Sequence, residues 1–108
     1  MTKIYYVDKK SRLEAMMTIS FRSKLNWLEE GLSILSWNYC FVSESNLSDL
    51  KEIYSFFKKW KGNSNSKKIG HCGISLGDII FLENEAWIVV GTGFQKIPNA
   101  LLEKISLQ

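Results

Sequence analysis

Residues 48–60 read Ser-Asp-Leu-Lys-Glu-Ile-Tyr-Ser-Phe-Phe-Lys-Lys-Trp, the most strongly patterned stretch of the chain. Its apolar residues recur at spacings of three and four, the period of one face of an α-helix. They are Leu50, Ile53, Tyr54 and Phe57. Phe56 and Trp60 lie at the margin of this stripe, and we expect both to belong to the core. The stretch predicts an amphipathic helix whose first turn is capped by Asn46 or Ser48.

Strands are predicted on both sides of this helix. In Trp37-Asn-Tyr-Cys-Phe-Val-Ser43, side chains alternate so that Trp37, Tyr39 and Phe41 share one face. Residues 78–82 and 86–90 are two apolar runs separated by a short polar turn at 83–85, the pattern of a β-hairpin. Residues 3–7 are rich in strand-forming residues and predict a first strand.

The connecting segments are less strongly patterned. We interpret 13–21 as an antiparallel partner of the first strand, although Leu13 to Met17 also fit a helix. Residues 22–30 predict a helix with Ser23 as a possible N-cap and Gly31 at its end. Residues 61–68, Lys-Gly-Asn-Ser-Asn-Ser-Lys-Lys, predict a flexible basic loop.

The end of the chain predicts two further short elements. Gly91-Thr-Gly93 interrupts the strand before it, and residues 94–97 are expected to continue that strand after a bend. Pro98 fits the first position of a last helix over 99–105. Together these elements predict one α+β domain over 1–108, a small antiparallel sheet with two or three helices packed on one face.

Composition agrees with a folded domain. The chain has 108 residues, 45% of them hydrophobic and 23% charged, with four Trp, four Tyr and six Phe. Large aromatic rings bury much area each, so a small core can be stable without disulfides or metal. The formal charge of +3 permits contact with an acidic protein or with nucleic acid but argues for neither.

Location and cofactors are predicted from what the sequence lacks. We expect a cytoplasmic protein, because no stretch approaches about 18 consecutive apolar residues and the first residues do not resemble a signal peptide. In the cytoplasm Cys40 and Cys72 are expected to be free thiols. Two Cys and one His do not have the repeated spacing of a zinc site. We therefore expect no metal, no cofactor and no membrane partner.

Several segments, in their order along the chain, resemble the YodL-like domain of Firmicute bacteria, phages and conjugative elements. The matching segments are Asn38-Tyr39 with Phe41-Val42, Leu50-Lys-Glu-Ile-Tyr-Ser-Phe-Phe57, Gly73-Ile-Ser-Leu-Gly-Asp-Ile-Ile80, Trp87-Ile-Val-Val90 and Gly93-Phe-Gln-Lys-Ile-Pro98. Cys72 and the 61–68 segment depart from the family pattern. The resemblance implies a small accessory protein of mobile elements and brings no catalytic residues with it.

Three places invite a catalytic interpretation, and for each a structural role is the better one. Asp78 follows a glycine at a strand entrance, so we expect it to accept hydrogen bonds from nearby backbone N–H groups. His71 and Cys72 are adjacent and point to opposite sides of an extended chain, so they would not pair as base and nucleophile. Gly91-Thr-Gly93 lacks the spacing of a phosphate-binding loop. We therefore predict that the protein is not an enzyme.

The lysine-rich part of the chain is the candidate binding site. Lysines on one face of the 48–60 helix continue into the following segment, where they could meet an acidic surface or phosphates. The predicted partner-binding residues are Lys51, Ser55, Lys58, Lys59, Lys61, Lys67 and Lys68. If Phe56 or Trp60 is exposed beside them, an aromatic anchor with a basic rim would form a protein-binding hot spot.

The leading functional hypothesis is a protein inhibitor. It would bind a host protein, such as a CRISPR effector or another defence nuclease, and act by steric occlusion. The alternatives are a nucleic-acid-binding accessory protein that uses the lysines, and an inhibitor of another host target such as a cytoskeletal protein.

Overall fold

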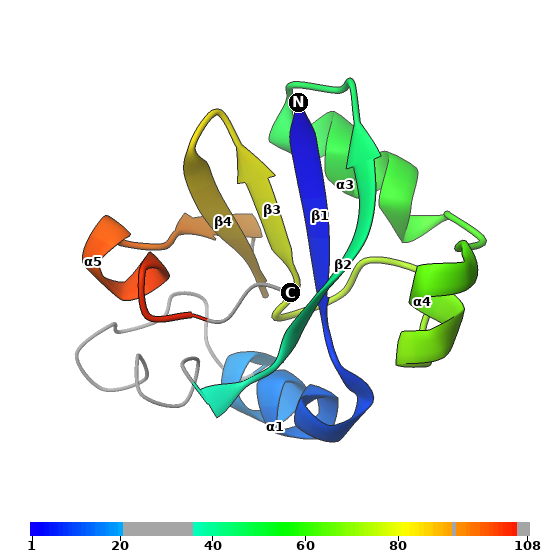
Figure 1. The fold of residues 1–108 in the computed structure, drawn as a ribbon, viewed down its shortest axis with the longest axis horizontal. Coiled ribbons are helices and arrows are strands. Elements are labelled where there is room, and N and C mark those ends of the chain that lie inside the picture. The colour runs from blue at the N-terminus through cyan, green and yellow to red at the C-terminus, as the bar shows by residue number, and fades with distance from the viewer. Residues whose placement is uncertain (21–35, 92, 106–108) are drawn as a thin grey trace.

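Five strands form one antiparallel sheet in the computed structural model, which describes residues 1–20, 36–91 and 93–105. The strands, in their order across the sheet, are β2 (Tyr39–Ser45), β1 (Thr2–Val7), β3 (Ile79–Leu82), β4 (Glu85–Val90) and β5 (Gly93–Lys96). The described residues also hold four helices, α1 (Lys9–Ser20), α3 (Leu50–Lys58), α4 (Ser64–Ile69) and α5 (Asn99–Leu102). The predicted small α+β fold with an antiparallel sheet is therefore confirmed (Figure 1).

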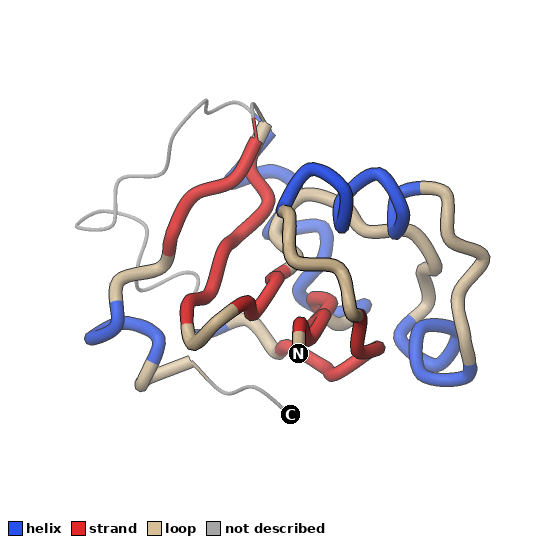
Figure 2. The backbone as a smooth tube through the Cα atoms, turned by 90° about the horizontal axis from the view of Figure 1, so that it is seen from above, coloured by secondary structure: helices blue, strands red, loops and turns tan. Residues whose placement is uncertain are grey.

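The helices cover both faces of the sheet, so the prediction that they pack on one face is wrong. Neighbouring residues of the central strands point to opposite faces, and both faces are apolar: Ile79 and Ile80 are both fully buried, each in a different core cluster. Helices α1 and α5 pack against the cluster of Ile79, and helices α3 and α4 against that of Ile80. Figures 1 and 2 show the strands between these two groups of helices.

The prediction of a strand over 13–21 is wrong for residues 13–20, because Lys9–Ser20 form helix α1; residue 21 lies outside the described residues. The carboxylate of Asp8 accepts the backbone N–H of Ser11 at 2.9 Å, which satisfies a donor of the first turn. Ala15 and Ile19, one helical turn apart, are both fully buried against the sheet. The strands that pair with β1 are β2 and β3. The predicted helix over 22–30 lies outside the described residues.

The segment predicted as a flexible loop, 61–68, mostly forms helix α4. Asn63 and Ser66 form a reciprocal capping box at its start. Asn63 also donates its side-chain N–H to the carbonyl of Val42 at 2.8 Å, where a bulge in β2 leaves Val42 without a partner in β1. Ile69 is buried, just beyond the segment that the sequence pattern assigned to the loop. This one apolar side chain and the capping box explain the helix.

The hairpin of β3 and β4 is confirmed. Glu83 and Asn84 form its two-residue turn, and both have positive φ (53° and 65°), as a type I′ turn requires. The expected continuation of β4 is instead a separate strand, β5, which runs back antiparallel, pairing Gly93 with Val90 and Lys96 with Trp87. The sheet thereby gains its fifth strand. The last helix is shorter than predicted, with Pro98 as its N-cap residue.

Helix α3 confirms the strongest prediction from sequence. It spans Leu50–Lys58, and its N-cap is Asp49 rather than Asn46 or Ser48. No helix in the described part of the chain is both long enough and apolar enough to cross a bilayer.

Candidate functional site

Helix α3 carries most of the residues predicted to bind a partner. The side chain of Asp49 accepts the backbone N–H groups of Lys51 at 2.9 Å and Glu52 at 3.1 Å, which fixes the start of the helix. Ile53 and Phe57 are buried against the sheet, so the opposite positions face solvent. The residues exposed there, which we call the α3 surface, are Lys51, Glu52, Ser55, Phe56, Lys58 and Lys59.

All seven predicted partner-binding residues are exposed, but they do not surround one hollow. Lys51 and Ser55 line a hollow beside β4 and β5. Lys68 lines a different hollow, which it shares with Lys9 and Lys10 of α1. Lys61 and Lys67 lie on the connection and on α4. The sequence did not place Lys9 and Lys10 beside Lys68, because the proximity of α1 and α4 depends on tertiary contacts.

Phe56 is exposed, which corrects the expectation that it belongs to the core. Its side chain is 55% accessible, whereas the adjacent Phe57 is buried at 2%. The two rings lie edge to face with centroids 5.0 Å apart. Trp60 is half-buried and packs edge to face on Phe57, also at 5.0 Å. The space beneath α3 is thus filled by Ile53, Phe57 and Trp60, and Phe56 is left on its flank.

A groove runs along the other flank of α3. It consists of two hollows of about 400 and 480 Å³, which adjoin because Lys51 and Phe94 line both. Tyr54 and Val89 form apolar walls of the first hollow, and the rings of Tyr54 and Phe94 meet edge to face at 5.8 Å. With about 100° per helical residue, Lys51 and Ser55 fall between the groove and Phe56. The α3 surface therefore joins an apolar groove to an exposed aromatic ring.

The charge of the α3 surface is largely uncompensated. None of its lysines forms an ion pair with a described residue. The ammonium group of Lys58 lies 5.7 Å from the ring centroid of Tyr54, a cation–π contact that leaves the charge in place. The far end of the groove is acidic, with Asp49 and Glu83 in its lining. The helix accordingly presents three ammonium groups and the carboxylate of Glu52, and the far end of the groove beside the β3–β4 turn is negative.

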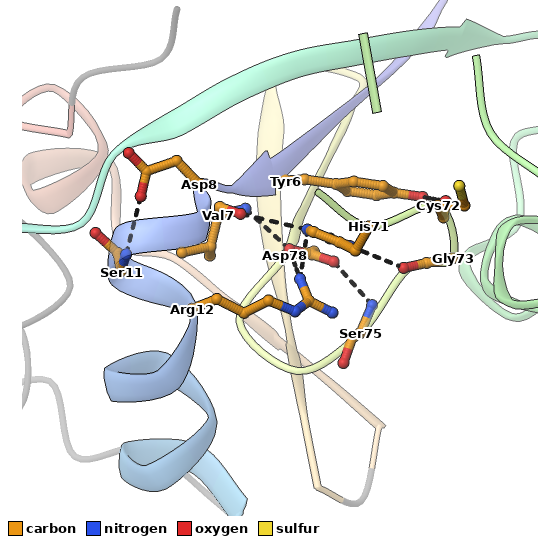
Figure 3. A network of polar contacts seen from close by, with 10 residues as sticks. All are labelled: Tyr6, Val7, Asp8, Ser11, Arg12, His71, Cys72, Gly73, Ser75 and Asp78. Atoms are coloured by element: carbon orange, nitrogen blue, oxygen red, sulfur yellow. Dashed lines mark hydrogen bonds and ion pairs between the residues drawn. The ribbon is translucent and has the colours of Figure 1, made fainter. Parts of the chain in front are cut away.

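A second candidate is the polar network of Asp78, which Figure 3 shows between β1, α1 and the segment before β3. Asp78 is fully buried, and its two carboxylate oxygens accept the backbone N–H groups of Val7 at 2.9 Å and Ser75 at 2.8 Å. The guanidinium of Arg12 lies 3.9 Å from the nearer oxygen. Burial raises the pKa of Asp78 to about 7. The hydrogen bond from Val7, the charge of Arg12 and the hydrogen bond from Ser75 oppose this rise.

His71 belongs to the same network. Both ring nitrogens of His71 are engaged: Nε2 contacts the guanidinium of Arg12 and, at 3.3 Å, the carbonyl of Val7, and Nδ1 contacts the carbonyl of Gly73 at 3.2 Å. The ring stacks on Tyr6 with centroids 4.4 Å apart, and the Tyr6 hydroxyl donates to the carbonyl of Cys72 at 2.7 Å. Burial, and secondly the charge of Arg12, lower the pKa of His71. The imidazole is held neutral.

This network is organised as a structural anchor. Asp78, His71 and Tyr6 each have their polar atoms engaged by protein groups, as Figure 3 shows. The ring nitrogens of His71 face Arg12 and the carbonyls of Val7 and Gly73, whereas the thiol of Cys72 lies against Gly62, so the two neighbours do not form a base–nucleophile pair. The prediction that Asp78 accepts backbone N–H groups is confirmed for Ser75. Its bonds to Val7 and its contact with Arg12 were not foreseen.

Metal-binding chemistry has no candidate in the described ranges 1–20, 36–91 and 93–105, where no three His, Cys, Asp or Glu side chains come together. Cys40 and Cys72 are both free and half-buried. Gly91 and Gly93 flank the reversal between β4 and β5 and line the groove rather than a phosphate loop.

Comparisons of the chain with models of known families, with curated proteins and with solved structures find no match. The resemblance to YodL-like domains therefore stays a prediction.

Proposed function

We propose that this protein is a non-enzymatic binding protein that attaches to another protein through the α3 surface and acts by covering the partner. The observation that carries the proposal is the exposed ring of Phe56 beside uncompensated lysines. Binding hot spots are enriched in aromatic anchors, and a polar rim around them excludes water from the contact. Isolated exposed apolar residues are common, so it is the combination with the adjoining groove that supports a docking surface.

Charge indicates the kind of surface that the partner presents. Lys51, Lys58 and Lys59 would be complemented by carboxylates, which would also accelerate association. A groove that binds nucleic acid is itself basic and would repel these lysines. If the partner is a host defence nuclease, as the resemblance to proteins of mobile elements implies, the contact is with an acidic face of that enzyme. This face must stay uncovered for the enzyme to change conformation or to assemble. Inhibition would then arise by steric occlusion.

A role without catalysis is supported by the way the polar side chains are used. Asp78 and His71, two titratable residues whose pKa values are shifted by burial, have their polar side-chain atoms engaged within the fold. A catalytic group would need an unsatisfied atom within reach of a substrate. The hollow of the groove beside β4 and β5 is lined mainly by apolar residues together with Lys51, which suits binding rather than group transfer.

The proposal is tested by site-specific crosslinking. A photoreactive amino acid at Ser55 should capture a protein partner, while the same group at Leu13, which is 69% exposed on α1, should not. The captured protein is then purified and its Kd measured against variants. We expect Phe56→Ser to weaken binding at least about tenfold, and Lys59→Glu to slow association and reduce its salt dependence.

Matched changes elsewhere serve as controls. Leu13→Ser removes an exposed apolar side chain from α1, and Lys104→Glu reverses an exposed charge beyond α5. Both variants should bind the purified partner as the wild type does. If the captured partner binds Phe56→Ser and Lys59→Glu with unchanged affinity, α3 is not the contact. If no captured protein binds the wild type after purification, the proposed function is refuted.

A further inference from the structure

A hollow of about 320 Å³ lies where the start of α1, the start of β2 and the end of α4 meet. Its lining shares no residue with the α3 surface. The six lining residues are Asp8, Lys9, Lys10, Cys40, Lys68 and Ile69. We call this hollow the lysine pocket. Its volume lies at the lower end of the range of small-molecule sites.

The lysine pocket is built by contacts between segments far apart in the chain. The backbone N–H of Asp8 donates to the carbonyl of Asn38 at 2.9 Å, which holds the start of α1 against the start of β2. Helix α4 ends at Gly70 in a left-handed conformation with φ 102°. A Cβ on Gly70 would lie 3.5 Å from the Cδ atom of Lys9, so the aliphatic part of Lys9 lies over this glycine. The end of α4 thereby stands next to α1 (Figure 1).

The lining of the lysine pocket carries three ammonium groups and one carboxylate, so its balance of charge is positive. Lys9, Lys10 and Lys68 are exposed, and none forms an ion pair with a described residue. The one carboxylate in the lining, that of Asp8, already accepts bonds from the backbone of Ser11 at 2.9 Å and from the side chain of Asn38 at 3.2 Å, which hold it in its capping position. Like charges around one concave surface repel, and a bound anion would relieve that repulsion.

The floor of the lysine pocket is apolar. Ile69 is 8% exposed, and the half-buried thiol of Cys40 lies beside it in the lining. Burial raises the pKa of Cys40, so the thiol is neutral and does not offset the lysines. An apolar floor below a cationic rim fits a ligand with one anionic group and one apolar or aromatic part, rather than a bare ion.

We propose that the lysine pocket binds an organic phosphate, whose phosphate group lies among the ammonium groups of Lys9, Lys10 and Lys68 and whose organic part lies over Ile69 and Cys40. A phosphate carries close to two negative charges at neutral pH and offers several acceptor oxygens, which suits three separate donors. The same chemistry could be presented by a free nucleotide or by a phosphate of a nucleic-acid strand.

The test is a two-dimensional NMR titration of the full chain with AMP, with a short single-stranded oligonucleotide and with adenosine. We expect AMP or the oligonucleotide to shift the amide signals of Lys10, Cys40 and Lys68, with a Kd on the order of 1 mM or tighter. Adenosine, which lacks the phosphate, should cause no shift there. Shifts with AMP identify a free nucleotide as sufficient, and shifts with the oligonucleotide alone identify a strand phosphate.

Charge-removing variants decide whether the pocket is responsible. Lys10→Gln with Lys68→Gln removes two charges but keeps polar side chains and should weaken binding about tenfold or more, whereas Lys3→Gln with Lys104→Gln removes the same charge at exposed sites elsewhere and should not. As a second readout, saturating ligand should slow alkylation of Cys40 in a Cys72→Ser protein. No shift with either phosphate compound, or equal binding by the two double variants, would overturn the proposal. These outcomes are independent of protein binding by α3.

Discussion

The carboxylate of Asp78 accepts the backbone N–H of Val7 at 2.9 Å, although the two residues lie 71 positions apart in the chain. The bond joins the end of β1 to the start of β3, and a second bond to Ser75 holds the turn before β3. Because Val7 is the last residue of β1 and only Asp8 separates it from α1, this one buried side chain sets how the first helix leaves the sheet.

Removing the Asp78 carboxylate should be strongly destabilising. In Asp78→Ala the N–H groups of Val7 and Ser75 lose their buried acceptor and Arg12 loses its counter-charge. We expect the free energy of unfolding to fall by about 3–5 kcal/mol in urea denaturation. Glu103→Ala, at an exposed site, should change it by less than about 0.5 kcal/mol. A loss of under about 1 kcal/mol for Asp78→Ala would contradict the anchoring role.

The raised pKa of Asp78 predicts a pH dependence with a definite sign. Its ordinary value of 3.8 is raised to about 7 by burial, so between these values the folded protein binds the proton that the unfolded chain releases. The extra stability that comes from this retained proton is therefore full below about pH 4 and is lost as the pH rises towards 7. The stability of the wild type relative to Asp78→Asn should fall across this window, by up to about 1.4 kcal/mol per pH unit. A difference in stability between the two proteins that does not change with pH would show that Asp78 has its ordinary pKa of 3.8.

The single histidine provides a direct electrostatic probe. The chain contains one His, so one imidazole resonance titrates in proton NMR without ambiguity. We expect the pKa of His71 to lie below 6.5, because burial and then the charge of Arg12 disfavour its protonation. Arg12→Gln should move this pKa upwards. A pKa at or above 6.5 in the wild type would show that Arg12 is not the partner of His71.

Loss of the hydroxyl should change the free energy of unfolding in opposite directions at two buried tyrosines. The hydroxyl of Tyr39 is buried and makes no hydrogen bond to a described residue, whereas that of Tyr6 donates to the carbonyl of Cys72 at 2.7 Å. Tyr39→Phe should raise the free energy of unfolding by about 1 kcal/mol, and Tyr6→Phe should lower it by a similar amount. Thermal and urea unfolding measure both. Destabilisation by Tyr39→Phe would indicate a partner for its hydroxyl, such as a bound water.

Asn63 should matter more than its neighbour Asn65. Asn63 caps α4 and donates to Val42 at 2.8 Å, whereas Asn65 makes only a contact of 3.4 Å with the same carbonyl. We expect Asn63→Ala to cost about 1–2 kcal/mol and to speed amide exchange in α4, and Asn65→Ala to cost under about 0.5 kcal/mol. Equal effects of the two substitutions would show that the capping box does not hold the helix.

The parts of the fold that were predicted correctly are those with a strong local signal. Helix α3 follows from its apolar stripe, and the β3–β4 hairpin from two apolar runs around a polar turn. The segment 13–21 failed because its period is ambiguous and the capping bond from Asp8 to Ser11 is too weak a signal in sequence. The loop prediction failed because it considered 61–68 without Ile69, the side chain that anchors α4.

The candidate site was predicted in its residue types but not in its arrangement. The seven predicted partner-binding residues, six lysines and Ser55, are all exposed, as polar side chains in contact with solvent should be. Sequence spacing could not show that Phe56 is exposed while Trp60 packs on Phe57, since both lie at the margin of the same stripe. Nor could it bring Lys9 and Lys10 beside Lys68, which requires the end of β1 and the end of α4 to meet.

The amino-acid sequence by itself determined where the chain forms α3 and the β3–β4 hairpin, because these elements depend on periodicity and composition within short windows. Tertiary structure alone decided that the helices cover both faces, that Asp78 binds Val7, and that the lysines divide between the α3 surface and the lysine pocket. The physical reason is that burial and charge compensation at each of these places depend on segments far apart in the chain, whose proximity no local pattern encodes.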